Sequence, residues 1–191
     1  MVERLNSLFE LDGKTLGILG LGSIGKKVAK CASGFGCKII YNKRNQLIPE
    51  EEKELGVEFV SFEDLVKRSD IISIHVPLNN ETRGLINKEV ISKMKDSVYL
   101  INTARSAIVD EEALFEALKS GKLGGVCLDV PRPENERSEF LAKFKDFENV
   151  LITPHISSLS FDSEEVWADQ MSENVRRVLE GETPLFILNN L

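Results

Sequence analysis

The stretch that decides the fold is TLGILGLGSIGKKVAK, which spans residues 15–30. Its apolar beginning predicts a buried strand over residues 15–20, and its end predicts a helix. The residues between the two satisfy the pattern G-x-G-x-x-G, in the order Gly20, Leu21, Gly22, Ser23, Ile24 and Gly25. A second predicted strand follows the helix, and in this setting the pattern is typical of a dinucleotide-binding fold.

Each residue of this glycine loop has an expected role. Gly20 permits the tight turn, Gly22 lets the backbone approach a diphosphate, and Gly25 allows the helix to pack closely on the strand. The free backbone N–H groups at the start of the helix, at Ser23 and Ile24, are expected to hold the diphosphate. The alternative is three unrelated turn glycines.

The rest of the chain repeats this alternation of short apolar runs and longer helical patterns. Most of the runs are nearly continuously apolar, as expected of strands that are covered on both faces in a parallel sheet. Signals for helix starts lie at Ser61, at Asp110 and near Ser160. Strands are predicted over residues 15–20, 37–42, 57–60, 70–76, 97–102, 124–130 and 149–155. The alternation predicts an α/β fold, a Rossmann-type doubly wound parallel sheet in three α/β/α layers.

The composition limits the class of protein. The chain has 191 residues, 42% of them hydrophobic, and a net charge of −7, which suits a globular domain. The acidic balance argues against nucleic-acid binding, and no apolar run approaches the ~20 residues of a membrane span. The three cysteines form no C-x-x-C pair. We therefore expect them to be small apolar residues of a protein in the reducing cytoplasm, with no role in binding metal.

The chain is predicted to have three parts. We predict a nucleotide-binding domain over residues 12–181, after a hinge-helix remnant (1–11) and before a tail (182–191) that would pack on a domain absent from this chain.

The end of the second predicted strand bears on the choice of cofactor. NAD-specific sites usually carry an acidic residue there, about 20 positions after the first glycine. This chain has Asn42 instead, followed by Lys43 and Arg44. A carboxylate would repel a 2′-phosphate, whereas Lys43 and Arg44 would attract one. The sequence therefore favours NADP(H), with NAD(H) possible; the alternative is that Lys43 and Arg44 are merely solvated.

Polar segments follow three later strands, at the edge where open α/β sheets bind ligands. These segments are residues 102–106 (NTARS), 129–134 (DVPRPE) and 154–158 (PHISS). Together with the glycine loop and HVPLNNETRGLI (75–86), they resemble the D-2-hydroxyacid dehydrogenase family, which includes phosphoglycerate dehydrogenases and glyoxylate/hydroxypyruvate reductases. The resemblance runs to the final helix and concerns only that family's cofactor domain. The substrate domain is expected to lie outside this chain.

The resemblance implies a catalytic set. Arg105 matches the arginine that grips the substrate carboxylate, His155 matches the acid/base histidine, and Glu134 matches its carboxylate partner. The loop before Glu134 departs from the family, with Pro131 in place of an aromatic residue and Asn135 in place of a proline. Each residue also has a plainer alternative. His155 could be a structural histidine, Glu134 a solvated loop acid, and Arg105 a surface ion-pair partner.

The resemblance also implies how the cofactor lies. The nicotinamide end is expected near Thr103, Ala104, Arg105, Asp129, His155, Ser157 and Ser158, and the adenosine and diphosphate near Val76, Pro77 and Thr82. For His75, which lies inside an apolar strand, we favour a structural role.

The chemistry fits these residue types. Reducing a 2-keto acid requires a hydride on carbon, a proton for the developing alkoxide and a cation for the carboxylate. Histidine suits the proton transfer, a neighbouring carboxylate favours imidazolium, and arginine offers a planar guanidinium that matches a carboxylate.

We expect the cofactor domain of an NAD(P)-dependent oxidoreductase of the glyoxylate/hydroxypyruvate reductase type. It would form a homodimer through this domain and would be a weak catalyst alone. Alternatives are a non-catalytic dinucleotide-sensing scaffold, or a formate or phosphite dehydrogenase; formate dehydrogenases of this kind carry glutamine where Glu134 stands.

Overall fold

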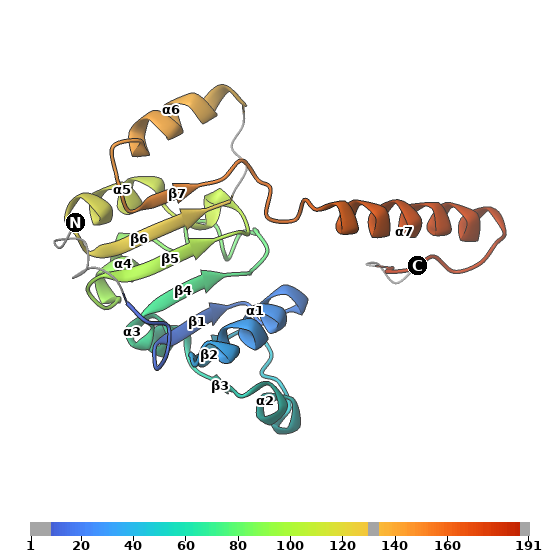
Figure 1. Cartoon of the computed structure of the whole chain (residues 1–191), viewed down its shortest axis with the longest axis horizontal. Helices are drawn as coiled ribbons and strands as arrows, with labels where there is room; N and C mark the ends of the chain where they lie inside the picture. The colour runs from blue at the N-terminus through green and yellow to red at the C-terminus, as the bar shows by residue number, and fades with distance from the viewer. Residues whose placement is uncertain (1–8, 130–133, 188–191) are drawn as a thin grey trace. The chain divides into compact units, whose positions relative to one another are not determined.

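A computed structural model describes residues 9–129 and 134–187 of the chain, with side chains for all of these except 134–137 (Figure 1). It divides into two compact units, Met1–His155 and Ile156–Leu191, which are described separately. The single domain predicted over residues 12–181 stays a prediction, as does the tail over 182–191. Most of the predicted hinge-helix remnant lies outside the described residues.

The first unit is built on a seven-stranded sheet in which every pair of neighbours is parallel (Figure 1). Its strands are β1 (Thr15–Leu19), β2 (Lys38–Asn42), β3 (Val57–Phe59), β4 (Ile71–Ile74), β5 (Val98–Asn102), β6 (Leu123–Leu128) and β7 (Val150–Ile152). Their order is β3-β2-β1-β4-β5-β6-β7, so the sheet grows outward in both directions from β1 and β4. The predicted Rossmann-type doubly wound sheet and its seven strands are confirmed.

Helices connect the strands, as parallel pairing requires. They are α1 (Ser23–Gly34), α2 (Pro49–Leu55), α3 (Phe62–Arg68), α4 (Lys88–Lys93), the short 3₁₀ helix η2 (Ser106–Ile108), α5 (Glu111–Lys119) and α6 (Glu134–Phe144). Two predicted starts are confirmed by their caps: Ser61 accepts a hydrogen bond from the Asp64 N–H, and Asp110 accepts one from the Ala113 N–H. Such caps satisfy N–H groups that the first turn leaves without a partner.

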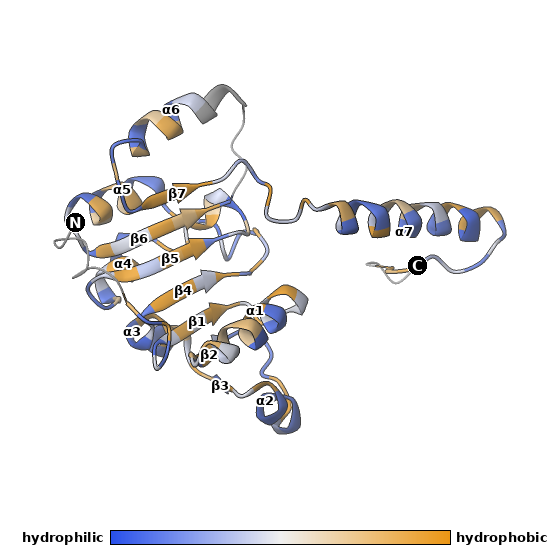
Figure 2. Cartoon of the chain, in the orientation of Figure 1, coloured by the Kyte–Doolittle hydropathy of each residue, from blue (hydrophilic) through white to orange (hydrophobic). Residues whose placement is uncertain are grey.

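The sheet has a hydrophobic core on each face. Along β2, Ile39 and Tyr41 pack in the smaller core with Ala29 of α1, whereas Ile40 belongs to the larger core. The division follows from the two-residue period of a strand, which turns alternate side chains to opposite faces. Figure 2 shows mainly apolar strands and a hydrophilic α2.

The second unit consists mainly of α7 (Phe161–Leu179), which confirms the predicted last helix. Ser160 caps it reciprocally with Ser163, each side chain accepting a hydrogen bond from the other residue's backbone N–H. Near its end, hydrogen bonds from Arg176 and Arg177 lower the pKa of Glu173 to about 2.

Candidate functional site

The glycine loop joins β1 to α1 at the carboxyl edge of the sheet. Gly20 has a φ of 98°, and a Cβ there would lie 2.8 Å from the backbone carbon of His75. A Cβ at Gly25 would lie 2.5 Å from the Gly20 carbonyl oxygen. Real Cβ atoms do not approach backbone this closely, so both positions require glycine. These are the turn and the packing roles that the motif predicts.

Gly22 differs from both, because a Cβ there would meet no atom within 4 Å. Its φ is −89°, a value that any residue adopts, so neither packing nor backbone conformation demands glycine. No side chain caps α1, its first turn carries no acidic residue, and Ser23 and Ile24 are exposed there. Exposed backbone N–H groups at the positive end of a helix suit a diphosphate. Within the described part of the chain, no contact requires glycine at position 22, whereas the close approach of a diphosphate would.

The end of β2 is tied to both of its neighbours. The Asn42 carbonyl accepts a hydrogen bond from the Gly20 N–H at 2.9 Å, and its side-chain amide donates to the Val60 carbonyl at 2.9 Å. Lys43 is half-buried, and Arg44 is exposed. The Arg44 guanidinium pairs with Glu81, at 2.7 Å between Nη2 and Oε2. The sequence did not indicate this contact, because Glu81 lies in a loop 37 positions further on.

The loop after β4 is a compact turn. The Asn79 side-chain oxygen accepts hydrogen bonds from the backbone N–H groups of Glu81 and Thr82. The Thr82 hydroxyl donates to the Pro77 carbonyl at 2.6 Å. Of the predicted cofactor contacts in this loop, Val76 is half-buried and Pro77 is exposed. The turn is therefore held by its own side chains.

His75 begins this loop and has structural contacts. Its backbone N–H donates to the Leu19 carbonyl at 2.7 Å, and its Nε2 lies 2.9 Å from the Ser73 hydroxyl. Burial lowers the pKa of its imidazole, because the charged form is poorly solvated there. These contacts fit the structural role favoured from the sequence.

Asn102 shapes the loop that follows β5. Its fully buried side chain donates to the Arg105 carbonyl at 2.9 Å and accepts from the Ala104 N–H at 3.0 Å. The Arg105 side chain is exposed and its Nη1 donates to the Ala104 carbonyl, while Thr103 and Ala104 are half-buried. Sequence reasoning placed Asn102 at a strand end but did not give it a role. The signal available was a polar residue directly after four strand residues.

The ends of β6 and β7 are joined to this loop. Asp129 is 2% exposed; its backbone N–H donates to the Asn102 carbonyl, and its carboxylate accepts from the Thr153 hydroxyl at 2.6 Å. Burial, together with this carboxylate, raises the pKa of the Cys127 thiol. Three neighbouring strand ends thus form one hydrogen-bonded polar cluster, made of Asn102, Asp129 and Thr153.

His155 follows this cluster directly. Its φ of 58° is left-handed, which is uncommon outside glycine, and its backbone N–H donates to the Thr153 carbonyl at 3.0 Å. Its side chain is exposed. A residue held in this sparsely populated conformation is a reason to look for function.

Several predicted site residues are not brought into this geometry. Glu134 begins α6, but its side chain lies outside the described residues, as does Pro131 altogether. Ser157 and Ser158 are exposed and belong to the second unit, so their role near the nicotinamide stays a prediction. Among the side chains described, no group of three His, Cys, Asp or Glu could hold a metal ion. No helix in the described ranges is long and apolar enough to cross a membrane.

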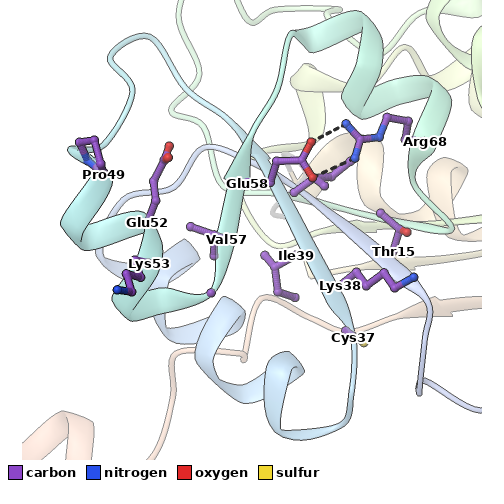
Figure 3. Close-up of a pocket in the computed structure, with 12 residues that line it drawn as sticks. Thr15, Cys37, Lys38, Ile39, Pro49, Glu52, Lys53, Val57, Glu58 and Arg68 are labelled. Atoms are coloured by element: carbon purple, nitrogen blue, oxygen red, sulfur yellow. Dashed lines mark hydrogen bonds and ion pairs between the residues drawn. The ribbon is translucent and has the colours of Figure 1, made fainter.

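A hollow of about 710 Å³ lies at the amino ends of the strands, opposite the glycine loop (Figure 3). Thr15, Lys38 and Val57, at the amino ends of three strands, line part of it. Two of the charged residues that line it pair with each other, because the Arg68 guanidinium donates to both Glu58 carboxylate oxygens, at 2.7 and 3.0 Å. Open α/β sheets bind ligands at the carboxyl ends of their strands, so this hollow is not the candidate site.

Comparison with known proteins identifies the family of this domain. The pattern described as "D-isomer specific 2-hydroxyacid dehydrogenase, NAD binding domain" matches residues 2–157. The chain belongs to this family. The resemblance found in the sequence is thereby confirmed, and the chain is an NAD-binding domain of this family.

Relatives of this NAD-binding domain are longer. Glyoxylate reductase of Thermococcus litoralis is 45% identical over 181 residues, which cover 95% of this chain and 54% of the relative. Glyoxylate reductase 1 of Saccharomyces cerevisiae is 43% identical over 172 residues, covering 90% and 48%. D-mandelate dehydrogenase of Rhodotorula graminis superposes with a TM-score of 0.90 at 34% identity, over 100% of this chain and 55% of that one. The chain spans about half the length of the curated relatives it matches.

Proposed function

We propose that this chain is the cofactor domain of an NADP(H)-preferring reductase of short 2-keto acids, of the glyoxylate/hydroxypyruvate type. The observation that carries the proposal is that the glycine loop, the Arg105 loop and His155 all follow strands at one edge of a parallel sheet. The names of the glyoxylate reductase relatives support the substrate class. A cytoplasmic homodimer formed through this domain is part of the same proposal.

The cofactor would lie along this edge. Gly22 and the N–H groups of Ser23 and Ile24 would hold the diphosphate, with Val76 and Thr82 on the adenosine side. Thr103, Ala104 and Asp129 would line the nicotinamide side. The rigid hydrogen-bonded cluster of Asn102, Asp129 and Thr153 supports this assignment, because a site that binds a planar ring needs fixed walls.

The cation pair after β2 supports NADP(H). Neither Lys43 nor Arg44 would repel a 2′-phosphate, and the Asn42 side chain is already bonded to Val60 and carries no charge. A charge-assisted hydrogen bond to phosphate is stronger than one to a ribose hydroxyl.

The catalytic residues would act on the bound keto acid. When bound, the nicotinamide cofactor supplies the hydride to the keto carbon. Arg105 would hold the substrate carboxylate with its planar guanidinium, and His155, as imidazolium, would give its proton to the oxygen that becomes the hydroxyl. Glu134 would orient the imidazole and favour its charged form.

Calorimetric titration of the 191-residue chain with NADPH and with NADH tests the cofactor assignment. We expect both to bind, with NADPH favoured by about 1–3 kcal/mol. Equal or reversed affinities would refute the preference, and binding of neither would refute the proposed function.

A further inference from the structure

The Arg44–Glu81 ion pair bridges two loops across the glycine loop. Arg44 follows β2 and Glu81 follows β4, and these two strands flank β1 in the sheet. The pair, at 2.7 Å, therefore spans the carboxyl end of β1, where Gly20 begins the turn into α1. The adenosine half of a dinucleotide that follows this loop toward the end of β2 must pass beside the pair.

Both ends of the bridge are held in place. Asn42, two residues before Arg44, is bonded to Gly20 and to Val60. Glu81 lies within the turn that Asn79 caps, where its own backbone N–H is bonded at 2.9 Å. The side chains themselves are 76% exposed for Arg44 and 73% exposed for Glu81. The backbone thus presents both charges at the site, while water and ligands have access to them.

We infer that Glu81 is a specificity-determining residue, which competes with the 2′-phosphate of NADPH for Arg44. The inference rests on the proposed cofactor assignment. An exposed ion pair contributes little stability, whereas arginine binds phosphate strongly, so the phosphate can displace the carboxylate. NADH carries only a hydroxyl at this position and leaves the pair intact, so Glu81 reduces the preference for NADPH without affecting NADH.

Dissociation constants for NADPH and NADH, measured on the full 191-residue chain at low and high salt, test this inference. The variants are Glu81→Gln, Arg44→Met and the double variant. The matched control is Glu89→Gln, which removes an exposed ion pair with Lys93 on α4, outside the site.

We expect Glu81→Gln to tighten NADPH binding about two- to fivefold at low salt, with less gain at high salt. NADH binding should change less than about twofold, as should both constants in Glu89→Gln. Arg44→Met should weaken NADPH binding roughly tenfold or more. In the Arg44→Met background, the gain from Glu81→Gln should largely disappear, because no arginine remains to compete for.

Each contrary result has a distinct meaning. If Arg44→Met lowers the NADPH preference but Glu81→Gln leaves it unchanged, the inference fails and the cofactor assignment stands. If the gain from Glu81→Gln persists in the Arg44→Met background, competition for Arg44 is wrong. If Arg44→Met leaves the preference unchanged, Arg44 does not bind the 2′-phosphate and the inference fails. The cofactor assignment fails only if the wild-type chain shows no preference for NADPH.

Discussion

Gly22 and Gly25 belong to one motif, yet an added methyl group would have opposite consequences at the two positions. At Gly25 it would collide with the Gly20 carbonyl oxygen, and at Gly22 it would enter open space. Packing therefore explains Gly25, and we propose that a bound diphosphate explains Gly22. This difference separates a test of the fold from a test of cofactor binding.

We expect Gly22→Ala to leave the free energy of unfolding within about 0.5 kcal/mol of wild type. The same change should weaken both NADH and NADPH binding by roughly tenfold or more. The added methyl group would occupy the space of the diphosphate, which would then lose its hydrogen bonds to the backbone N–H groups. Gly25→Ala should instead lower the free energy of unfolding by about 1–3 kcal/mol. The control is Gly34→Ala in the same helix, where a Cβ meets nothing within 4 Å. Urea unfolding and calorimetry measure both effects, and wild-type affinity in Gly22→Ala would contradict the diphosphate site.

His155→Ala tests the proton donor, in an enzyme completed with the family's substrate domain. We expect turnover of a short 2-keto acid to fall by roughly 10²–10⁴-fold, the usual range for general acid–base catalysis. Arg105→Lys should raise KM and lower kcat, because a point charge does not reproduce the bidentate fork. Neither change should alter dinucleotide affinity much in the 191-residue chain. Near-wild-type turnover in His155→Ala would rule out this proton donor.

The loops after β5, β6 and β7 are positioned by hydrogen bonds between strand ends. Parallel pairing brings the ends of β5, β6 and β7 together, so that Asp129 bonds to the Asn102 carbonyl and to the Thr153 hydroxyl. The Asn102 side chain fixes the loop after β5 through its local bonds to Ala104 and Arg105. Asn102 acts on Arg105 through the backbone and is a positioning residue. Buried amides in this role are costly to remove, because the groups that they satisfied remain buried.

Asn102→Ala should therefore lower the free energy of unfolding by about 1–3 kcal/mol. The matched control is Asn149→Ala, which removes one exposed side-chain hydrogen bond to the Gly124 carbonyl and should cost less than about 1 kcal/mol. In the completed enzyme, Asn102→Ala should also raise KM for the keto acid, because the Arg105 loop loses its anchor. An equal loss of stability in the two variants would show that Asn102 does not hold the loop.

Stability of the first unit as a whole should depend on pH through His75. Burial lowers the pKa of His75 in the folded chain, so below about pH 6.5 the unfolded chain binds a proton that the folded chain does not. The free energy of unfolding should therefore decrease as the pH falls through this range. His75→Gln should reduce that decrease, as measured by urea unfolding at several pH values between about 7.5 and 5. An identical pH dependence in the variant would show that His75 is not responsible.

Self-association is expected for the chain. Within α7, Trp167, Met171, Val175 and Val178 are each more than half exposed. Exposed apolar groups of this extent mark interaction surfaces. Sedimentation at micromolar concentration should show a dimer or a larger species, and Met171→Asp should reduce the association if α7 takes part. A single monomeric species in the wild type would refute the proposal.

The sequence alone determined the seven strands, the glycine loop, the cofactor-domain family and the caps of α3, α5 and α7. These features depend on local signals: continuous apolar runs, a glycine spacing, and a capping side chain next to the turn that it satisfies. The contact of Glu81 with Arg44 was decided only by the tertiary structure, as was the role of Asn102. The Glu81 contact depends on which strands lie side by side, since the order β2-β1-β4 brings together loops 37 positions apart. The side-chain bonds of Asn102 are local, to Ala104 and Arg105, and packing decides that this side chain is buried. The environment of Asp129 was also decided only by the tertiary structure. The sequence places Asp129 at a strand end, but only packing shows that its carboxylate is buried and accepts a hydrogen bond from Thr153.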